Sequence, residues 1–324
     1  MSAPHVVVTG ATGFVGSAVL RRLAAQAPQA VVCAVSRTPP ATAHGVRWVD
    51  ADLAAAESLR GVCDGADVLL SLASYIGPDA ERCAAVNSVG TEALVAEARR
   101  AGVGRIVQLS TCAVYGPGPH RGQDVGELTP APVSPASRSR LAGEEPVLEA
   151  GGLVLRAGLV LGTGDRWVVP ALVDAFRRVP AGWGGGEGLA SFVDVDDLAR
   201  LIVAFALGGS GGGSGSGDAA GASGVLHAHH PEPVRNRDLM TALAGHRVLP
   251  QRPAGDWPWP TCLDALAGTP GWVSERQFTL LARDHWYRAD EAWRLAGIAP
   301  GPGPLARLGR AAQWYRERGG LVPG

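Results

Sequence analysis

The hydrophobic pattern of the first half of the chain alternates between two periods. Short runs of four to seven mainly β-branched and apolar residues recur along residues 5–156. Between them lie longer stretches whose apolar residues return every three to four positions, as on one face of a helix. This alternation predicts an α/β fold built on a doubly wound parallel sheet. Strands are expected at 5–9, 30–36, 46–50, 67–72, 105–110 and 153–156, and helices at 15–25, 80–100 and 138–149.

The second half of the chain has a different composition. Residues 163–189 are rich in glycine and contain two tryptophans, and 208–224 consists almost entirely of glycine, serine and alanine, which predicts a flexible surface loop. A strand at 225–229 is expected to rejoin the sheet, and 231–324 has the pattern of short helices joined by proline-rich turns. We therefore expect two parts, a large domain formed by 1–166 and 190–230, and a smaller lobe formed by 167–189 and 231–324.

Charge and cysteine content exclude several classes of function. A formal net charge of −1 provides no basic surface, so nucleic acid is not an expected partner. The N-terminal segment has no charged leader, and no stretch reaches the ~18 apolar residues of a membrane helix, so we expect a soluble, cytoplasmic protein with no membrane partner. The five cysteines have no Cys-x-x-Cys spacing, which argues against disulfides and zinc, and we expect no metal at residues 227–230 either.

A glycine-rich turn directly follows the first predicted strand and opens the first helix. Glycines in this position allow a tight turn, let the backbone approach a pyrophosphate, and leave the N–H groups of the helix start facing it. The turn therefore predicts a dinucleotide site, with cofactor contacts from Gly10, Thr12, Gly13, Phe14, Val15 and Gly16.

The end of the second strand indicates which dinucleotide is bound. An acidic residue there would hold the ribose 2′-hydroxyl of NAD, but this chain has Ser36 and Arg37, and no carboxylate before Asp50. Because a guanidinium pairs well with a phosphate dianion, we expect NADP(H). The alternative is that Arg37 is a solvated surface residue. Asp52 and Leu53 are expected to line the adenine pocket, although Asp52 could equally cap a helix.

Motifs spread over most of the chain share a pattern with one enzyme family. They are Thr9–Gly16, Asp52-Leu53, Leu72-Ala73-Ser74, Asn87–Thr91, Ser110–Gly116, Leu155–Gly158, Phe192–Asp197 and Asp290–Ala292. In these motifs the chain resembles the extended short-chain dehydrogenase/reductases, which include nucleotide-sugar epimerases and dehydratases. The resemblance implies a Rossmann-like dinucleotide-binding domain with a smaller C-terminal substrate lobe. It also implies a nicotinamide site near Leu72, Ala73, Ser74 and Gly158, with Thr111 in the place of the family's catalytic Ser/Thr. The alternative for Thr111 is a strand residue bonded to backbone.

One segment departs from this family. Where the family has Tyr-x-x-x-Lys, residues 136–140 have Ala136 and Arg140, and the chain contains no lysine at all, which codon usage alone could explain. Arg140 could bind the nicotinamide ribose, or be a solvated helix residue, but it stays protonated and cannot serve as an acid. Ser137, Thr111 and Tyr75 are the remaining candidate hydrogen-bond donors in catalysis. Loss of a general acid slows a reduction by about 10²–10⁴-fold without preventing it.

The second lobe contains most of the nine tryptophans, and these suit a flat aromatic substrate unless they form the lobe's core. A substrate hydroxyl beside the ketone could replace the missing acid. In lacking both residues the chain resembles atypical ketoreductases of angucyclinone antibiotic pathways. We therefore expect an NADPH-dependent ketoreductase of a polycyclic aromatic polyketide ketone. The alternatives are a non-catalytic NADP(H) sensor and a redox-neutral epimerase or dehydratase. Family members often dimerise through the helices corresponding to 80–100 and 138–149, so a homodimer is considered, although arginines leave no clear apolar seam.

Overall fold

A seven-stranded parallel sheet forms the centre of the protein, whose computed structural model describes residues 3–39, 45–208, 218–250 and 255–318. The strands run in the order β12-β7-β5-β4-β1-β2-β3, and every neighbouring pair is parallel. Their bounds are β1 His5–Thr9, β2 Val31–Ser36, β3 Arg47–Asp50, β4 Val68–Ser71, β5 Arg105–Thr111, β7 Leu153–Ala157 and β12 Gly224–Ala228. The strand order reverses between β1 and β4, and at such a reversal the carboxyl edge of a doubly wound sheet binds its ligand. The doubly wound α/β prediction is confirmed.

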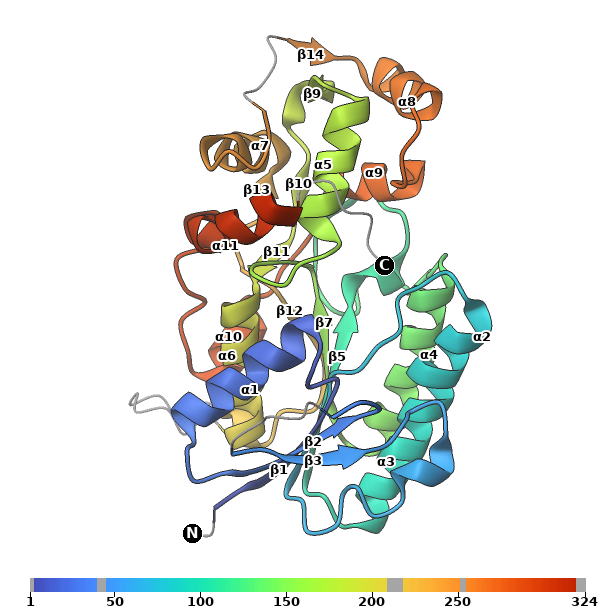
Figure 1. Ribbon diagram of the computed structural model, residues 1–324, viewed down its shortest axis with the longest axis vertical. Coiled ribbons are helices and arrows are strands. Elements are labelled where there is room, and N and C mark those ends of the chain that lie inside the picture. The colour runs from blue at the N-terminus through green and yellow to red at the C-terminus, as the bar shows by residue number, and fades with distance from the viewer. Residues whose placement is uncertain (1–2, 40–44, 209–217, 251–254, 319–324) are drawn as a thin grey trace.

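Helices cover both faces of this sheet. On one face, α1 (Phe14–Gln26) and α6 (Val195–Leu207) pack on each other and share an apolar core with the strands. On the other face, α3 (Gly90–Arg100) and α4 (Pro135–Glu149) enclose a second core (Figure 1). Apolar residues on both sides of each strand explain why the strands appear in the sequence as continuous apolar runs.

The predicted helix at 80–100 is interrupted. The segment consists of α2 (Ala80–Cys83), a π-helical stretch η2 (Ala84–Val89) and then α3. A π-helical turn inserts one residue per turn relative to an α-helix, and such turns often occur at functional sites. The insertion turns the buried Asn87 toward the loop that follows β4.

A smaller four-stranded sheet and a core of its own lie outside the central sheet. The order of this sheet is β13-β10-β15-β6, and two further pairs, β11 with β8 and β14 with β9, complete the strands. The strands are β6 His120–Gln123, β8 Leu159–Leu161, β9 Gly182–Trp183, β10 Leu189–Ala190, β11 Phe192–Asp194, β13 Val234–Arg235, β14 Asp256–Trp257 and β15 His285–Tyr287. The helices are α5 Val168–Arg178, α7 Asn236–Gly245, α8 Trp259–Gly268, α9 Glu275–Ala282, α10 Asp290–Ala296 and α11 Pro304–Arg318, and the short 3-10 turns are η1 Ala56–Leu59, η3 Cys112–Tyr115, η4 Gly184–Gly186 and η5 Asp218–Ala220.

The structure corrects the sequence-based picture at helix α5, which lies inside 163–189, where no helix was predicted. Residues 209–217 of the expected loop 208–224 lie outside the described residues, so that prediction is not tested there. The expected strand 225–229 is β12, which pairs with β7 at the edge of the sheet. Helix α10 packs into the core of the large domain through Ala292 and Trp293, so the C-terminal part returns to that domain. The proposed division into two parts remains a prediction.

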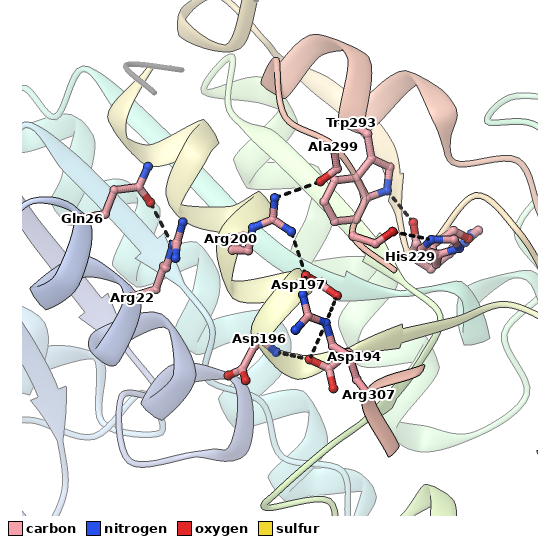
Figure 2. Close-up of polar contacts among 12 residues, drawn as sticks. Arg22, Gln26, Asp194, Asp196, Asp197, Arg200, His229, Trp293, Ala299 and Arg307 are labelled. Carbon is pink, nitrogen blue, oxygen red and sulfur yellow. Dashed lines mark hydrogen bonds and ion pairs between the residues drawn. The ribbon is translucent and has the colours of Figure 1, made fainter. Parts of the chain in front are cut away.

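Buried ion pairs fasten α11 to α6, as Figure 2 shows. Arg307 of α11 donates to both carboxylate oxygens of Asp197, whose side chain is only 4% exposed. Arg200 also binds Asp197 at 2.8 Å and reaches the carbonyl of Ala299 at 3.0 Å. Asp194 caps α6 by accepting from the backbone N–H of Asp196 at 3.0 Å. Across the described residues, no helix combines the length and apolarity that crossing a membrane requires.

Candidate functional site

The turn between β1 and α1 has the geometry of an anion site. Gly10 has a φ of +68°, and a Cβ there would lie 2.6 Å from the backbone nitrogen of Ala73. A Cβ on Gly16 would lie 2.1 Å from the carbonyl oxygen of Gly10, so both positions require glycine. Helix α1 begins at Phe14 without any side-chain cap within the described structure, which leaves its first N–H groups available to a phosphate. These residues fit the pyrophosphate of a dinucleotide.

The loop after β4 is fixed beside this turn. Thr9 Oγ1 accepts from the backbone N–H groups of Leu72 at 3.2 Å and Ala73 at 3.4 Å. Asn87 Oδ1 accepts from the Tyr75 N–H at 2.7 Å, and Asn87 Nδ2 donates to the Tyr75 carbonyl at 2.8 Å and to Ser139 Oγ at 3.0 Å. Asn87 thus holds the expected nicotinamide-side loop against α4. From the sequence, Asn87 was identified only as part of the motif Asn87–Thr91. The feature that could have identified its role is a polar residue at a buried position of a predicted helix.

Ser137 belongs to the cap of α4. Ser134 is the N-cap residue, and the two serines form a capping box in which Ser137 Oγ accepts from the Ser134 N–H and donates to the Ser134 carbonyl, both at 3.1 Å. Ser137 is 3% exposed. Because its one proton is engaged in this cap, the geometry gives no support to Ser137 as a catalytic donor.

Tyr75 packs on its own loop. The Arg82 guanidinium of α2 lies 4.8 Å from the centre of the Tyr75 ring. A Cβ on Gly77 would lie 2.2 Å from the Tyr75 hydroxyl, so that hydroxyl sits directly against the glycine. These contacts account for the half-buried ring, and a catalytic role for Tyr75 remains a prediction without geometric support.

Thr111 ends β5, and Arg140 of α4 binds the backbone of the same strand close to that end. Thr111 Oγ1 accepts from the Ala113 N–H at 3.1 Å, and in the part of the chain that the structure describes the hydroxyl has no acceptor for its own proton. Arg140, on α4, donates from Nη2 to the Leu109 carbonyl at 3.1 Å, two residues before Thr111. Burial lowers the pKa of Arg140 to about 10, so it remains a cation at neutral pH. The site therefore offers a free hydroxyl donor beside a partly desolvated positive charge.

A buried polar network lies behind this strand end. Glu144, one turn after Arg140, forms an ion pair with Arg156 of β7 at 2.6 Å and accepts a hydrogen bond from the Ser110 hydroxyl. Arg156 Nη1 donates to the Tyr115 hydroxyl at 2.9 Å, and that hydroxyl lies 2.8 Å from His227 Nε2. Burial raises the pKa of Tyr115, which fits a structural role. This network was not predicted, because the three partners of Glu144 and Tyr115, which are Ser110, Arg156 and His227, lie at least 12 positions from the residues that they contact.

The residues expected to select the cofactor lie at the ends of β2 and β3. Ser36 is half-buried and accepts from the Thr38 N–H at 3.2 Å. Arg37 is exposed and forms no contact with any described residue. Asp52 accepts from the Ala54 N–H at 3.0 Å and so caps the turn before η1, which is compatible with its expected place at the adenine. Leu53 is buried against Gly90.

The remaining expected contacts are buried by neighbouring elements. A Cβ on Gly158 would lie 2.4 Å from the Ser191 carbonyl oxygen, so the backbones of Gly158 and Ser191 pass close to each other.

Trp183 is 2% exposed, and its neighbours in the second lobe pack around the same core. Trp257, Trp259 and Trp272 belong to that packing, and Trp286 lies over Gly122. Trp183 is therefore a core residue, whereas Trp257, Trp259 and Trp272 are half-buried against that core.

Comparison with known proteins gives one consistent result. The sequence pattern of the NAD dependent epimerase/dehydratase family matches residues 6–215. A 4-hydroxy-2-methyl-3-oxo-4-farnesyl-3,4-dihydroquinoline-1-oxide ketoreductase of Stigmatella aurantiaca is 32% identical over 251 residues, 73% of this chain and 71% of its own length. A 2-alkyl-3-oxoalkanoate reductase of Stenotrophomonas maltophilia is 25% identical over 323 residues, 91% of this chain and 94% of its own.

Solved structures show the same fold. A UDP-glucuronic acid 4-epimerase of Bacillus cereus, crystallised with NAD, superposes with a TM-score of 0.70 at 17% identity over 97% of this chain and 99% of its own. The fold, the matched family pattern and the Stigmatella reductase agree with the phosphate turn described above. The chain belongs to the NAD dependent epimerase/dehydratase family and is an oxidoreductase- or epimerase-type enzyme with a nicotinamide dinucleotide cofactor.

Proposed function

We propose that the protein is an NADPH-dependent ketoreductase acting on a polycyclic aromatic ketone of the angucyclinone type, in the biosynthesis of an antibiotic polyketide. The observation that carries this proposal is the strand end of β5, where the Thr111 hydroxyl keeps a free proton beside the Arg140 cation. The Stigmatella relative is named as a ketoreductase of a dihydroquinoline compound, which supports a ketone on a fused ring system as the substrate of this protein.

The cofactor preference rests on Arg37. The phosphate turn binds the pyrophosphate, and Arg37, exposed at the end of β2, is placed to pair with a ribose 2′-phosphate. Arg140 occupies the position where the resemblance places the family's Lys, so it binds the nicotinamide ribose and keeps a positive charge near the reacting carbonyl. When bound, NADPH supplies the hydride.

The protein's own groups then act on the ketone oxygen. Thr111 donates a hydrogen bond to this oxygen, and the developing negative charge is stabilised by Arg140. A threonine hydroxyl is too weak an acid to release its proton alone, so the proton that completes the alcohol comes from water or from a phenol or enol hydroxyl of the substrate. Hydride adds to the carbonyl carbon, one proton adds to the oxygen, and the products are a secondary alcohol and NADP⁺.

The test follows NADPH absorbance with a panel of hydroxylated anthraquinone-like ketones. We expect consumption of NADPH with ketones that have a hydroxyl beside the carbonyl, and at least tenfold slower turnover with the matched methyl ethers, which lack that proton. Tight NADPH binding with no consumption by any ketone would instead identify a non-catalytic sensor. Conversion of a substrate without release of tightly bound NAD would identify a redox-neutral epimerase or dehydratase.

A further inference from the structure

Trp167 differs from every other tryptophan of the chain in its exposure. All nine tryptophans lie within the described residues, and eight are buried or half-buried, whereas Trp167 is 38% exposed. An indole that is more than a third exposed keeps part of its flat apolar face available to a ligand. The loop that carries it leads directly into α5.

The backbone of Trp167 is rigidly held. The Asp165 carboxylate, 1% exposed, accepts from the N–H groups of Trp167 at 2.8 Å and of Val168 and Val169 at 2.9 Å. Asp165 therefore both caps α5 and fixes the point from which the Trp167 side chain leaves the chain. The backbone from which the Trp167 side chain projects is thus fixed by hydrogen bonds.

Helix α11 holds the same loop from the other side. The Tyr315 hydroxyl accepts from the Gly162 N–H at 2.7 Å and donates to Asp165 at 3.2 Å. Trp314 Nε1 donates to the Asp165 carbonyl at 3.0 Å. Because Arg307 fastens α11 to Asp197 (Figure 2), the loop is tied through α11 to the core of the large domain.

The loop lies against the phosphate turn. A Cβ on Gly164 would lie 2.8 Å from the Phe14 ring, and Phe14 is the first residue of α1. Figure 1 shows the start of α5 above the N-terminal end of α1, at the carboxyl edge of the central sheet. Two more of the six exposed large apolar residues of the described chain, Ile76 after β4 and Val133 just before α4, belong to loops at this edge.

We propose that Trp167 is a specificity-determining residue on which the fused ring system of the ketone stacks. This inference rests on the proposed function and adds the contact that selects the substrate class. A rigid indole beside the cofactor turn favours a flat aromatic face, since stacked aromatic rings attract one another beyond their burial. The neighbouring Arg166 is also exposed, and it provides a matched test of the competing chemistry, a substrate that carries a phosphate.

The experiment compares Trp167→Ala, Trp167→Phe and Arg166→Ala in the full-length protein. For each, the dissociation constant of a fluorescent hydroxyanthraquinone is measured by titration in the presence of NADP⁺, together with KM for that compound and for a single-ring ketone. We expect Trp167→Ala to weaken polycyclic binding and raise its KM about tenfold, with single-ring KM and NADPH affinity changed less than twofold. Trp167→Phe should restore most of the affinity, and Arg166→Ala should leave it unchanged.

The outcomes separate this inference from the proposed function. If wild-type protein consumes NADPH with ketones but Trp167→Ala affects single-ring and polycyclic ketones equally, or alters NADPH affinity, then Trp167 does not select the ring system. A loss of affinity in Arg166→Ala alone would assign the ligand contact to Arg166 instead of Trp167. If no ketone consumes NADPH, the proposed function fails, and the titration still decides whether Trp167 binds the aromatic ligand. Failure of wild-type protein to bind any polycyclic compound would overturn both.

Discussion

Replacing either member of the buried Glu144–Arg156 pair by an apolar residue should destabilise the fold strongly. The two side chains are 2% and 8% exposed, and Arg156 donates from Nε and Nη2 to both carboxylate oxygens over 2.6 to 3.2 Å. Glu144→Leu leaves the guanidinium buried with the Tyr115 hydroxyl, and Arg156→Met leaves the carboxylate with Ser110. Breaking a buried ion pair by removing one partner typically costs about 3–5 kcal/mol, so we expect a loss of that size from each variant.

The double variant Glu144→Leu/Arg156→Met should recover much of this loss. It removes both charges, and replacing a buried pair by apolar residues of similar volume is often close to neutral. The hydrogen bonds that Ser110 and Tyr115 lose should leave a residual cost of about 2 kcal/mol. The resulting coupling energy, about 4–8 kcal/mol, is what a double-mutant cycle measures.

The assay is urea unfolding at neutral pH, followed in parallel by far-ultraviolet circular dichroism and tryptophan fluorescence, whose coincidence checks two-state behaviour. Glu127→Leu is the matched control, because Glu127 and Arg288 form an ion pair at 2.9 Å whose side chains are 52% and 49% exposed. Its expected change is below about 1 kcal/mol. The reasoning is refuted if the buried single variants lose no more than this control, or if the double variant loses the sum of the two singles.

Three further predictions concern the cofactor, the catalytic hydroxyl and the pH dependence of stability. Arg37→Glu should weaken NADPH binding about 100-fold and NADH binding much less, since it replaces a charge-assisted bond by repulsion. Fluorescence titration measures the affinity for both dinucleotides, with Arg276→Glu on the exposed face of α9 as the control variant. Equal effects on NADPH and NADH would remove the NADP assignment. Thr111→Ala should lower kcat about tenfold, the value of one hydrogen bond, with Thr111→Ser near wild type in steady-state assays; complete loss would make Thr111 the central donor. Burial raises the pKa of Asp194 to about 6, above its value of about 3.9 in the unfolded chain, so its contribution to stability is present at low pH and is lost as the pH rises through 6. Asp194→Asn, which can keep the cap of α6, should therefore stabilise the protein by on the order of 2 kcal/mol at pH 8 and not at pH 4 in urea titrations; a difference independent of pH would contradict this.

The strands β1, β2, β4 and β7 of the central sheet were predictable, because each is largely a continuous apolar run that is buried on both faces. The bounds of β1 and β5 agree with the expected ones to within one residue. The turn at Gly10 was predictable because its positive φ and close backbone contact require glycine. Helix α5 was not predictable from its surroundings. Its apolar face is present in residues 168–178, but it begins after a glycine-rich stretch and depends on a cap by Asp165 that Tyr315 holds in place from 150 residues away.

The site was predictable where short motifs define it and not where distant partners meet. The phosphate turn follows from a local pattern, whereas the pairing of Glu144 with Arg156 joins a helix to a neighbouring strand. Glu144 and Arg156 resemble solvated charges in the sequence, since nothing local reveals their burial. The tryptophans show the same limit, because composition places them in the second lobe but only packing separates the core Trp183 from the exposed Trp167.

An active site without the family's acid must obtain its rate from position and charge. The missing proton donor is worth about 3–5 kcal/mol, whereas precise placement of hydride and carbonyl can supply about 7–11 kcal/mol. Such placement requires a rigid strand end, and this protein fixes the end of β5 through Ser110 on the Glu144 carboxylate, and the facing loop through Asn87. Under the proposed function, the acid that is missing at position 136 is the one part of this arrangement that a substrate hydroxyl can replace, whereas the hydrogen bonds that fix the end of β5 and the facing loop must come from the protein itself.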